Sequence, residues 1–589
     1  MHRFFQCLQF KGKKTILAGM TAAALSLGSA TGFTAERVGD FALLDQDGRY
    51  HHMAWYDNNK AVALLVQASG DVATEQSIES YSQLKAQYED QGIVFFMINP
   101  LGEQRAAVKS EAARLGVDIP VLIDDAQLIS EAIGINKTGE AFLFDPKSFR
   151  VVYRGPSGQP LGDAIAEVVA GKAVSNAEVA AQGTAVAYPA RDQNMQAGVS
   201  YANDVAPILA ENCATCHRDG GIAPFALNSH AMAQGWSPMI REVLMTKRMP
   251  PGQIDPHIGE FRNHYTLSPD EQQKLLHWIA AGSVKDGATD PLADLTWSQD
   301  KWAFGEPDLI IKIPPQNIPA TGVLEYIDVV IPIEGLDRDR WVRASQYVPG
   351  DRTVLHHTLN ALIEPGKRPQ QGLITRFSDP DRAYITPYIP GADPHVEEPN
   401  TGGVLRADTT IALNLHYTTT GKETVDASEI GVWFYPDDQI PTERRLGDCA
   451  CIFTPTWTNI PAHDPDFEQS AEVNITTDAY ITAFTPHMHF RGKRMTYDAH
   501  YPDGSVERLL NIAQYNYNWQ MEYQLVEPKF VPAGTKVIAT GAFDNSAQNK
   551  ANPDPERSVP WGQQSWDEMF FGQVYWTAAK PTSEVSSTN

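Results

Sequence analysis

Ala61-Val62-Ala63-Leu64-Leu65-Val66-Gln67 is an almost unbroken apolar run, and it predicts a strand buried on both faces. Around this run, helical and apolar patterns alternate in a regular order. Helices are expected at residues 75–89 and 106–115, and further strands at 93–98, 120–123 and 141–145. The alternation predicts a small α/β domain with a central sheet over residues 36–172.

The chain has 589 residues and a formal net charge of −25, from 47 Lys and Arg against 72 Asp and Glu. At about 150 residues per domain, this length predicts about four domains. Hydrophobic residues at 42% and charged residues at 20% are ordinary for globular proteins, which excludes a wholly disordered chain. The acidic balance repels phosphate backbones, so nucleic acid is excluded as a partner.

The N-terminus has the pattern of an export signal. A basic head at residues 3–14 precedes an apolar stretch at 15–30, which ends in the small residues Gly28-Ser29-Ala30. We expect a signal peptide over residues 1–30; the alternative is a retained N-terminal anchor. No later apolar run approaches the ~18 residues that a membrane span needs, so we expect no span in the mature chain and a periplasmic or secreted location.

The segments Val38-Gly39-Asp40-Phe41 and Glu140-Ala141-Phe142-Leu143-Phe144-Asp145-Pro146 resemble the redoxin branch of the thioredoxin-like superfamily. In that family a reactive Cys follows the strand matched here by 61–67, and a cis-proline faces it. Here the loop 68–74 contains no Cys, and residues 137–139 are Lys-Thr-Gly. Thiol chemistry needs a thiolate, so we expect a structural or docking role for this domain rather than peroxidase or reductase activity.

Residues 173–198 are rich in Ala, Gly, Ser, Asn and Gln and predict a flexible linker. The next unit, 199–290, contains Cys213-Ala214-Thr215-Cys216-His217. In an exported protein this pattern indicates covalent attachment of one haem c, with His217 as an axial iron ligand. A redox dithiol or half a zinc site would need a thioredoxin helix or a second Cys pair nearby, and neither is present.

The sixth iron ligand is expected downstream of this motif. Met249, held by the two prolines that follow it, is the best candidate, and Met245 is the rival. Met249 as an ordinary core residue is the structural alternative. A closing helix at 267–282 completes a pattern that resembles an all-α class I cytochrome c domain.

The last ~290 residues are rich in strand and turn signals and predict two β-sandwiches, at 303–440 and 441–580. His487 and His489 are spaced by two, so in a strand both imidazoles leave the same face and can bind one ion. His356 and His357 are adjacent, so a strand end or bulge must turn one of them if both are to bind. Three imidazoles suit copper or zinc, and two sites of different ligand softness favour copper.

These motifs resemble, in their order, the type II copper-dependent monooxygenases, whose fold is a pair of jelly-roll sandwiches. The matching elements are His-His, then His-Tyr at 416, then His-x-His, then the Met of Asp567-Glu568-Met569. The resemblance implies two coppers. His356, His357 and His416 would hold the electron-transferring copper, and His487, His489 and Met569 would hold the copper that binds dioxygen; a structural zinc site is the alternative.

Two departures bear on the substrate and on the cysteines. The amidating members of the family hold a peptide carboxylate with Arg, Asn and Tyr, where this chain has Thr485, Phe571 and Gln573. We therefore expect a small organic substrate rather than a peptide C-terminus. Cys449 and Cys451 are expected either as a disulfide or as thiols able to hold Cu(I).

The sequence thus predicts a monooxygenase that hydroxylates a C–H bond with O₂. Electrons from an external donor, a respiratory protein or a small reductant, would pass through its own haem. The alternative is a non-enzymatic electron-transfer or copper-binding protein on the same scaffold. A thiol enzyme led by the redoxin-like domain is a third reading, which the missing cysteines oppose.

Overall fold

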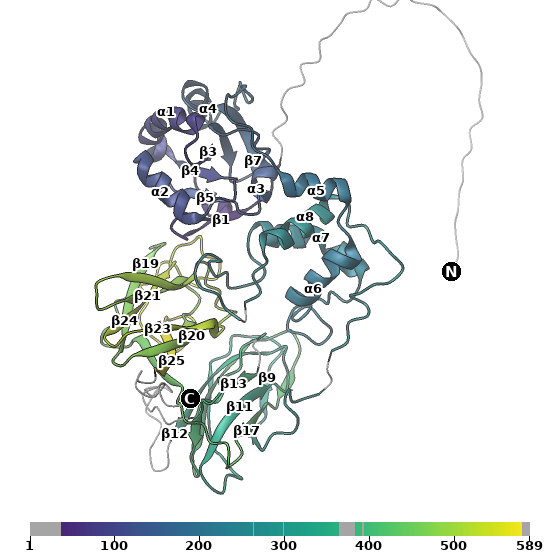
Figure 1. Ribbon diagram of the computed structural model, residues 1–589, viewed down its shortest axis with the longest axis vertical. Helices are drawn as coiled ribbons and strands as arrows, with labels where there is room; N and C mark the ends of the chain where they lie inside the picture. Colours follow the sequence, from purple (N-terminus) through teal and green to yellow (C-terminus); the bar gives the residue numbers. More distant parts are fainter. Residues whose placement is uncertain (1–36, 263, 298–299, 364–382, 392–393, 580–589) are drawn as a thin grey trace, which may run out of the picture.

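The protein is described by a computed structural model, which covers residues 37–262, 264–297, 300–363, 383–391 and 394–579. Figure 1 shows an N-terminal α/β domain, a helical region and several antiparallel sheets in the C-terminal half. The expected signal peptide lies outside the described residues. In the described ranges, no helix combines the length and apolar character needed to cross a bilayer.

The N-terminal domain is built on one seven-stranded sheet, in the order β2-β1-β5-β4-β3-β6-β7. Strand β3 pairs in parallel with β4, which pairs in parallel with β5, while β6 runs antiparallel to β3. The strands are β1 (Ala42–Asp45), β2 (Tyr50–His52), β3 (Ala61–Val66), β4 (Ile93–Asn99), β5 (Val121–Ile123), β6 (Glu140–Asp145) and β7 (Arg150–Pro156). The helices are η1 (Met53–Tyr56), α1 (Val72–Tyr88), η2 (Glu89–Gln91), α2 (Arg105–Leu115), α3 (Leu128–Ile133) and α4 (Gln159–Val169). The expected strands and helices are therefore present.

Both faces of this sheet are buried, because alternate residues of each strand point to opposite sides. In β3, Ala61 and Leu65 belong to a core shared with α1, α2 and α4. Val62 and Leu64 belong to a second core on the other face. The completely apolar sequence of β3 follows from this double burial.

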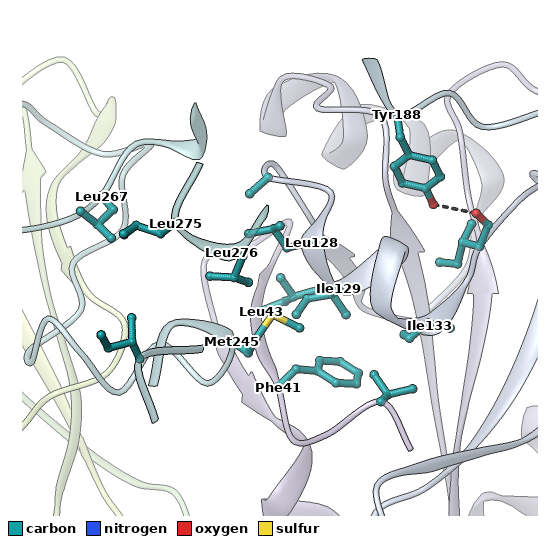
Figure 2. Close-up of a cluster of buried hydrophobic side chains, with 14 of the residues drawn as sticks. Phe41, Leu43, Leu128, Ile129, Ile133, Tyr188, Met245, Leu267, Leu275 and Leu276 are labelled. Carbon is teal, nitrogen blue, oxygen red and sulfur yellow. Dashed lines mark hydrogen bonds between the residues drawn. The ribbon is translucent and has the colours of Figure 1, made fainter. Parts of the chain in front are cut away.

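The second core is shared with the helical unit, residues 199–290. Phe41, Leu43 and Leu128 of the first domain pack in one cluster with Met245 and Leu276 of the helical unit (Figure 2). The helices of this region are α5 (Pro189–Ala197), η3 (Tyr201–Val205), α6 (Ala206–Asn212), α7 (His230–Met245) and α8 (Pro269–Ala280). The first domain and the helical unit therefore do not have separate cores.

Residues 173–198 differ from the expected flexible linker. They run along the first domain, with bridges between Lys137 and Ala185 and between Arg154 and Glu178, and they end in α5. Tyr188 is buried and donates a hydrogen bond of 2.7 Å to the carbonyl of Ile135 (Figure 2). A small, polar composition is compatible with a linker, but these tertiary contacts hold the segment in place.

The first β unit, residues 303–440, contains a three-stranded sheet β10-β15-β12 and a larger sheet β13-β11-β17-β8, with β14 paired to β11 and a separate pair β16-β9. Its strands share one apolar core. They are β8 (Leu309–Lys312), β9 (Gln316–Ile318), β10 (Ile327–Pro332), β11 (Arg340–Val348), β12 (Leu355–Ile363), β13 (His395–Val396), β14 (Gly403–Leu405), β15 (Thr410–Tyr417), β16 (Thr424–Asp426) and β17 (Glu429–Phe434).

The second β unit, residues 441–579, has two four-stranded antiparallel sheets, β18-β25-β20-β23 and β19-β24-β21-β22, around a common core. Cys449 and Cys451 in β18 are joined by a disulfide. The strands are β18 (Leu446–Ile452), β19 (Phe467–Ile475), β20 (Ala479–His487), β21 (Gly492–His500), β22 (Val506–Ile512), β23 (Tyr523–Val531), β24 (Thr535–Phe543) and β25 (Phe570–Ala578).

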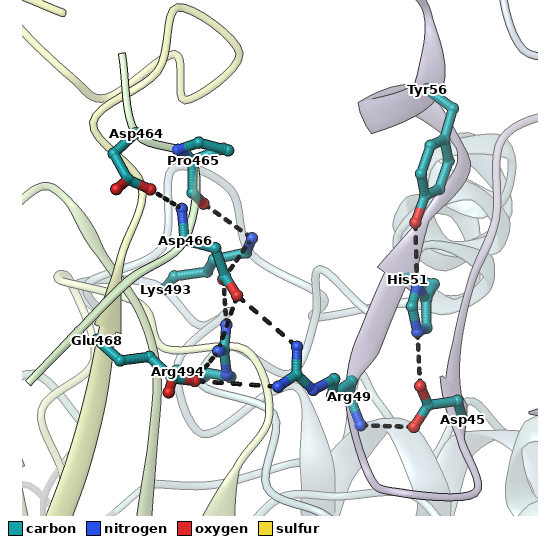
Figure 3. Close-up of polar contacts among 10 residues, drawn as sticks. All are labelled: Asp45, Arg49, His51, Tyr56, Asp464, Pro465, Asp466, Glu468, Lys493 and Arg494. Carbon is teal, nitrogen blue, oxygen red and sulfur yellow. Dashed lines mark hydrogen bonds and ion pairs between the residues drawn. The ribbon is translucent and has the colours of Figure 1, made fainter. Parts of the chain in front are cut away.

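The N-terminal domain also contacts the second β unit. Arg49, between β1 and β2, lies 3.7 Å from Asp466, which also pairs with Lys493 at 2.9 Å (Figure 3). Nearby, the buried carboxylate of Asp255 pairs with Arg105 of α2 and accepts a hydrogen bond of 3.0 Å from Asn511 of β22. Asp255 thus joins the N-terminal domain, the helical unit and the second β unit at one point.

Candidate metal and haem centres

His356, His357 and His416 lie together at the paired ends of β12 and β15. His357 is opposite His416 in the register, and the pairing shifts between Leu355 and His357, which is the irregularity that two adjacent ligands require. The ring centroids of His357 and His416 are 3.9 Å apart, and those of His356 and His357 are 4.8 Å apart. The structure therefore brings these three imidazoles together.

His487, His489 and Met569 lie where β20 ends and β25 begins. His487 is the last residue of β20 and is paired in register with Phe571, two residues after the buried Met569. His489 lies just beyond the strand, and its ring centroid is 5.2 Å from that of His487. The backbone therefore places all three residues at one end of this sheet.

The two groups of histidines meet between the β units. The ring centroids of His357 and His487 are 6.3 Å apart. The ring of Tyr517 lies 4.9 Å from that of His356 and 6.3 Å from that of His489. The two groups, one on each β unit, therefore face each other at a single junction.

Most of these imidazoles are anchored through one nitrogen and free at the other. Nδ1 of His487 donates to Oε1 of Gln520 at 2.5 Å, Nδ1 of His489 donates to the carbonyl of Asp567 at 3.3 Å, and Nε2 of His416 donates to Asn414. Within the described part of the chain, the buried nitrogens that lack a hydrogen-bond partner include Nε2 of His357, Nδ1 of His416, Nε2 of His487 and Nε2 of His489. An anchored ring with a free, buried nitrogen is the arrangement that metal ligands adopt.

The protonation state agrees with metal binding. Burial lowers the pKa of His487 to about 4, and burial lowers the pKa values of His357, His416 and His489 well below the ordinary value. All four rings are therefore neutral at neutral pH, with a lone pair available for a metal. The donor set fits copper, although among the described residues no three His, Cys, Asp or Glu side chains already form a ligand cage.

The Cys-x-x-Cys-His motif follows directly after α6. Cys213 and Cys216 are free thiols, and the amides of Cys216 and His217 both donate to the carbonyl of Cys213. Nδ1 of His217 donates to the carbonyl of Phe225 at 3.2 Å, which leaves Nε2 for iron. These residues fit covalent haem attachment and axial ligation.

Met249 follows α7 in the helical unit. It is 39% exposed and lines, together with Met245, a cavity of about 530 Å³ between the helical unit and the N-terminal domain. The lining of this cavity does not include Cys213, Cys216 or His217. Both candidates for the sixth ligand, Met249 and Met245, therefore line the same cavity.

The segments that would surround a redoxin thiol are present in the N-terminal domain, but the thiol is not. The start of α1 faces residues 137–139, since a Cβ on Gly139 would lie 2.8 Å from the carbonyl oxygen of Ala73, the second residue of that helix. Asp71 caps α1 by accepting from the amide of Thr74. The chain has no cysteine between Cys7 and Cys213, so no thiol is available there.

A cavity of about 180 Å³ lies between the two β units and is lined by both His357 and His487. Arg445 and Glu522 also line it, and Arg445 donates to Glu522 at 2.7 Å. The guanidinium of Arg445 lies 4.6 Å from the ring of Tyr384 and 4.1 Å from that of Tyr575. Thr485, Phe571 and Gln573 also line the cavity. Sequence reasoning missed Arg445, Glu522 and Tyr384, because nothing in their local sequence relates them to the histidines.

No family model matches the chain. Two curated proteins named thiol-disulfide oxidoreductase ResA are similar to part of it. The protein from Geobacillus thermodenitrificans is 29% identical over 140 residues, covering 22% of this chain and 79% of the relative. The protein from Geobacillus kaustophilus is 28% identical over 147 residues, covering 23% of this chain and 83% of the relative.

The solved structures that are similar also cover about a quarter of the chain. A hypothetical protein from Sinorhizobium meliloti has 24% identity and a TM-score of 0.24, covering 26% of this chain and 92% of that one. A thioredoxin-family thiol:disulfide interchange protein from Chlorobium tepidum has 20% identity and a TM-score of 0.21, covering 23% and 97%. The sequence likeness to ResA, together with the α/β sheet, makes the N-terminal domain thioredoxin-like.

Proposed function

We propose that the protein is an exported copper-dependent monooxygenase that hydroxylates a C–H bond of a small organic substrate with O₂. Electrons would come from an external donor through a covalently bound haem c. A redox role also agrees with the similarity of the N-terminal domain to thiol-disulfide oxidoreductases. That domain has no thiol of its own, so we assign the redox chemistry to the remaining units and a docking role to the domain.

The observation that carries the proposal is the junction of the two histidine groups. Buried, neutral imidazoles with free nitrogens face each other from both β units, and His357 and His487 line the cavity between them. Unpaired buried polar atoms cost ~1–3 kcal/mol each, so their concentration at one junction points to a ligand that satisfies them. A cavity of about 180 Å³ beside them is suited to a small substrate.

Each residue has a distinct task in this proposal. His356, His357 and His416 would hold one copper, and His487, His489 and Met569 would hold the other. Bound copper would supply one-electron chemistry and, where a thioether favours Cu(I), binding of dioxygen. Glu568 holds the second group in shape, since its carboxylate accepts from the backbone amides of His489 at 2.8 Å and Arg491 at 2.7 Å.

Four further side chains that line the cavity would orient the substrate. Tyr384 and Tyr575 supply aromatic surface, and Arg445 and Glu522 supply fixed charges. Thr485 occupies the place of the arginine that the amidating enzymes have, and the Arg445 guanidinium in the lining is already paired with Glu522, which disfavours pairing with a peptide carboxylate.

Haem would be attached at Cys213 and Cys216 and bound by His217, with Met249 as the proposed sixth ligand. Replacing Cys213 and Cys216 by Ala should abolish attachment and stop turnover driven by a protein donor. A strong chemical reductant should still support turnover by acting on copper directly. Equal turnover of the haem-free protein with both kinds of donor would contradict the proposed role of the haem.

The test of the function is oxygen uptake by the reduced, copper-loaded protein with and without candidate small organic substrates, with ¹⁸O₂ to follow incorporation. An oxygenase couples uptake to a product that contains one ¹⁸O atom, and His487→Ala should abolish that product. A protein that binds copper and transfers electrons without forming product would instead be the non-enzymatic alternative.

A further inference from the structure

The turn Asn516–Gln520, between β22 and β23, touches both histidine groups and the helical unit. We infer that it is a shared positioning element, which orients one histidine of each group and is pinned to the helical unit by Trp519. The inference deepens the proposed function and rests on it.

Two residues of the turn reach across the junction. Asn518 accepts a hydrogen bond of 2.7 Å from Nε2 of His356 on the first β unit, and Gln520 accepts one of 2.5 Å from Nδ1 of His487 on the second. These bonds fix the tautomer of each ring. They leave Nε2 of His487 without a partner, while Nδ1 of His356 carries a lone pair that accepts a hydrogen bond of 2.7 Å from Nδ1 of His357.

Hydrogen bonds among its own residues hold the turn in shape. The amide of Trp519 donates to the carbonyl of Asn516 at 2.8 Å, and the amide of Asn518 donates to the side chain of Asn516 at 2.9 Å. Nε2 of Gln520 donates to the carbonyl of Tyr517 at 2.8 Å. Asn518 and Gln520 therefore move together, and a shift of the turn displaces both histidines.

Trp519 fixes the turn against two other units. A Cβ on Gly252 of the helical unit would lie 2.5 Å from Cδ1 of the indole, and a Cβ on Gly391 of the first β unit would lie 2.6 Å from Cη2. The same point at Gly391 is 3.5 Å from Sγ of Cys216 in the haem motif. The indole thus fills a space that only glycine backbones leave open, and it belongs to the apolar cluster against which Cys216 of the haem motif packs.

Outer groups of this kind orient metal ligands, and their loss typically costs about 10- to 100-fold in metal affinity. We expect Asn518→Leu to weaken the site of His356, and Gln520→Leu to weaken the site of His487. Trp519→Leu should weaken both. Asn518→Asp keeps the acceptor oxygen and should restore the affinity that Asn518→Leu loses.

The experiment is competition for Cu(I) with a chromophoric chelator, together with Cu(II) electron paramagnetic resonance spectra, on the full chain. Each substitution is tested in a protein that keeps only one of the two sites. The site of His487 is removed by His487→Ala with His489→Ala, and the site of His356 is removed by His356→Ala with His357→Ala. The matched control is Asn474→Leu on the exposed part of β19. The expected result is a loss of about 10- to 100-fold at the supported site, rescue by Asn518→Asp, and no change in the control.

Affinities and spectra unchanged in Asn518→Leu and Gln520→Leu, in a wild type that binds two coppers, would overturn this inference alone. A wild type that takes up no copper would overturn the proposed function as well. Loss of affinity that Asn518→Asp does not restore would assign the turn a purely structural role, which also contradicts the inference.

Discussion

Leu276→Ala should destabilise the sheet of the N-terminal domain as well as α8, the helix that contains Leu276. Leu276 lies in α8, is 6% exposed and belongs to the same cluster as Phe41 and Leu128 of the N-terminal domain (Figure 2). The same helix face bonds to the first domain, since Gln273 donates to the carbonyl of Ala126 at 2.8 Å. The substitution therefore opens a cavity between two units rather than inside one.

Buried Leu→Ala substitutions cost about 2–5 kcal/mol, which corresponds to an increase of about 30-fold to several thousand-fold in the opening equilibrium. The assay is native-state hydrogen–deuterium exchange read by mass spectrometry of peptides from α8 and from β3. We expect protection in both to fall by the same factor. Leu413→Ala in the separate core of the first β unit is the control and should leave both unchanged.

Faster exchange in α8 with unchanged exchange in β3 would refute the reasoning. It would show two cores that open independently, as a chain of separate domains joined by linkers would behave. It would also mean that the N-terminal domain could be removed without disturbing the haem motif, an outcome that the shared core argues against.

Three further predictions concern ion pairs and the proposed copper ligands. Asp255→Asn should lower the free energy of unfolding by about 3–5 kcal/mol, because Arg105 would keep a buried charge without its partner; an unchanged thermal unfolding temperature would contradict this. Burial raises the pKa of Glu522, but Arg445, His395 and Gln524 together lower it more, so the folded pKa lies below the unfolded value of about 4.3. The pair therefore stabilises the fold above about pH 4.3, and this stabilisation is lost as the pH falls through the folded pKa. In Glu522→Gln, the free energy of unfolding measured with denaturant should depend less on pH below about 4.3. Met569→Leu should weaken Cu(I) binding at one site while costing under about 1.5 kcal/mol of stability, and loss of both coppers or of the fold would count against its assignment as a ligand.

The N-terminal domain could be predicted from its sequence because its signals are local. The apolar run at 61–67 specifies a doubly buried strand by itself, and the structure has β3 there. The adjacency of His356 and His357 likewise predicts a local irregularity, and the pairing of β12 with β15 shifts at that point. Local sequence is sufficient wherever one strand or one turn determines the geometry.

Contacts between distant segments could not be predicted in this way. Residues 173–198 have the composition of a linker, and only their contacts with the strands of the N-terminal domain hold them in place. The turn Asn516–Gln520 carries no recognised motif, and its importance depends on His356, far away in the sequence, lying against Asn518. The sequence contains the ligands of the candidate site but does not show which groups orient them.

The most direct test of the central claim is the metal content of the full chain, measured by mass spectrometry of copper and iron after copper loading and removal of unbound metal. The histidine groups and the Cys213-Ala214-Thr215-Cys216-His217 motif predict two coppers and one covalently attached haem iron per chain. A single copper in the wild type, or iron that acid extraction removes with the haem, would contradict the claim.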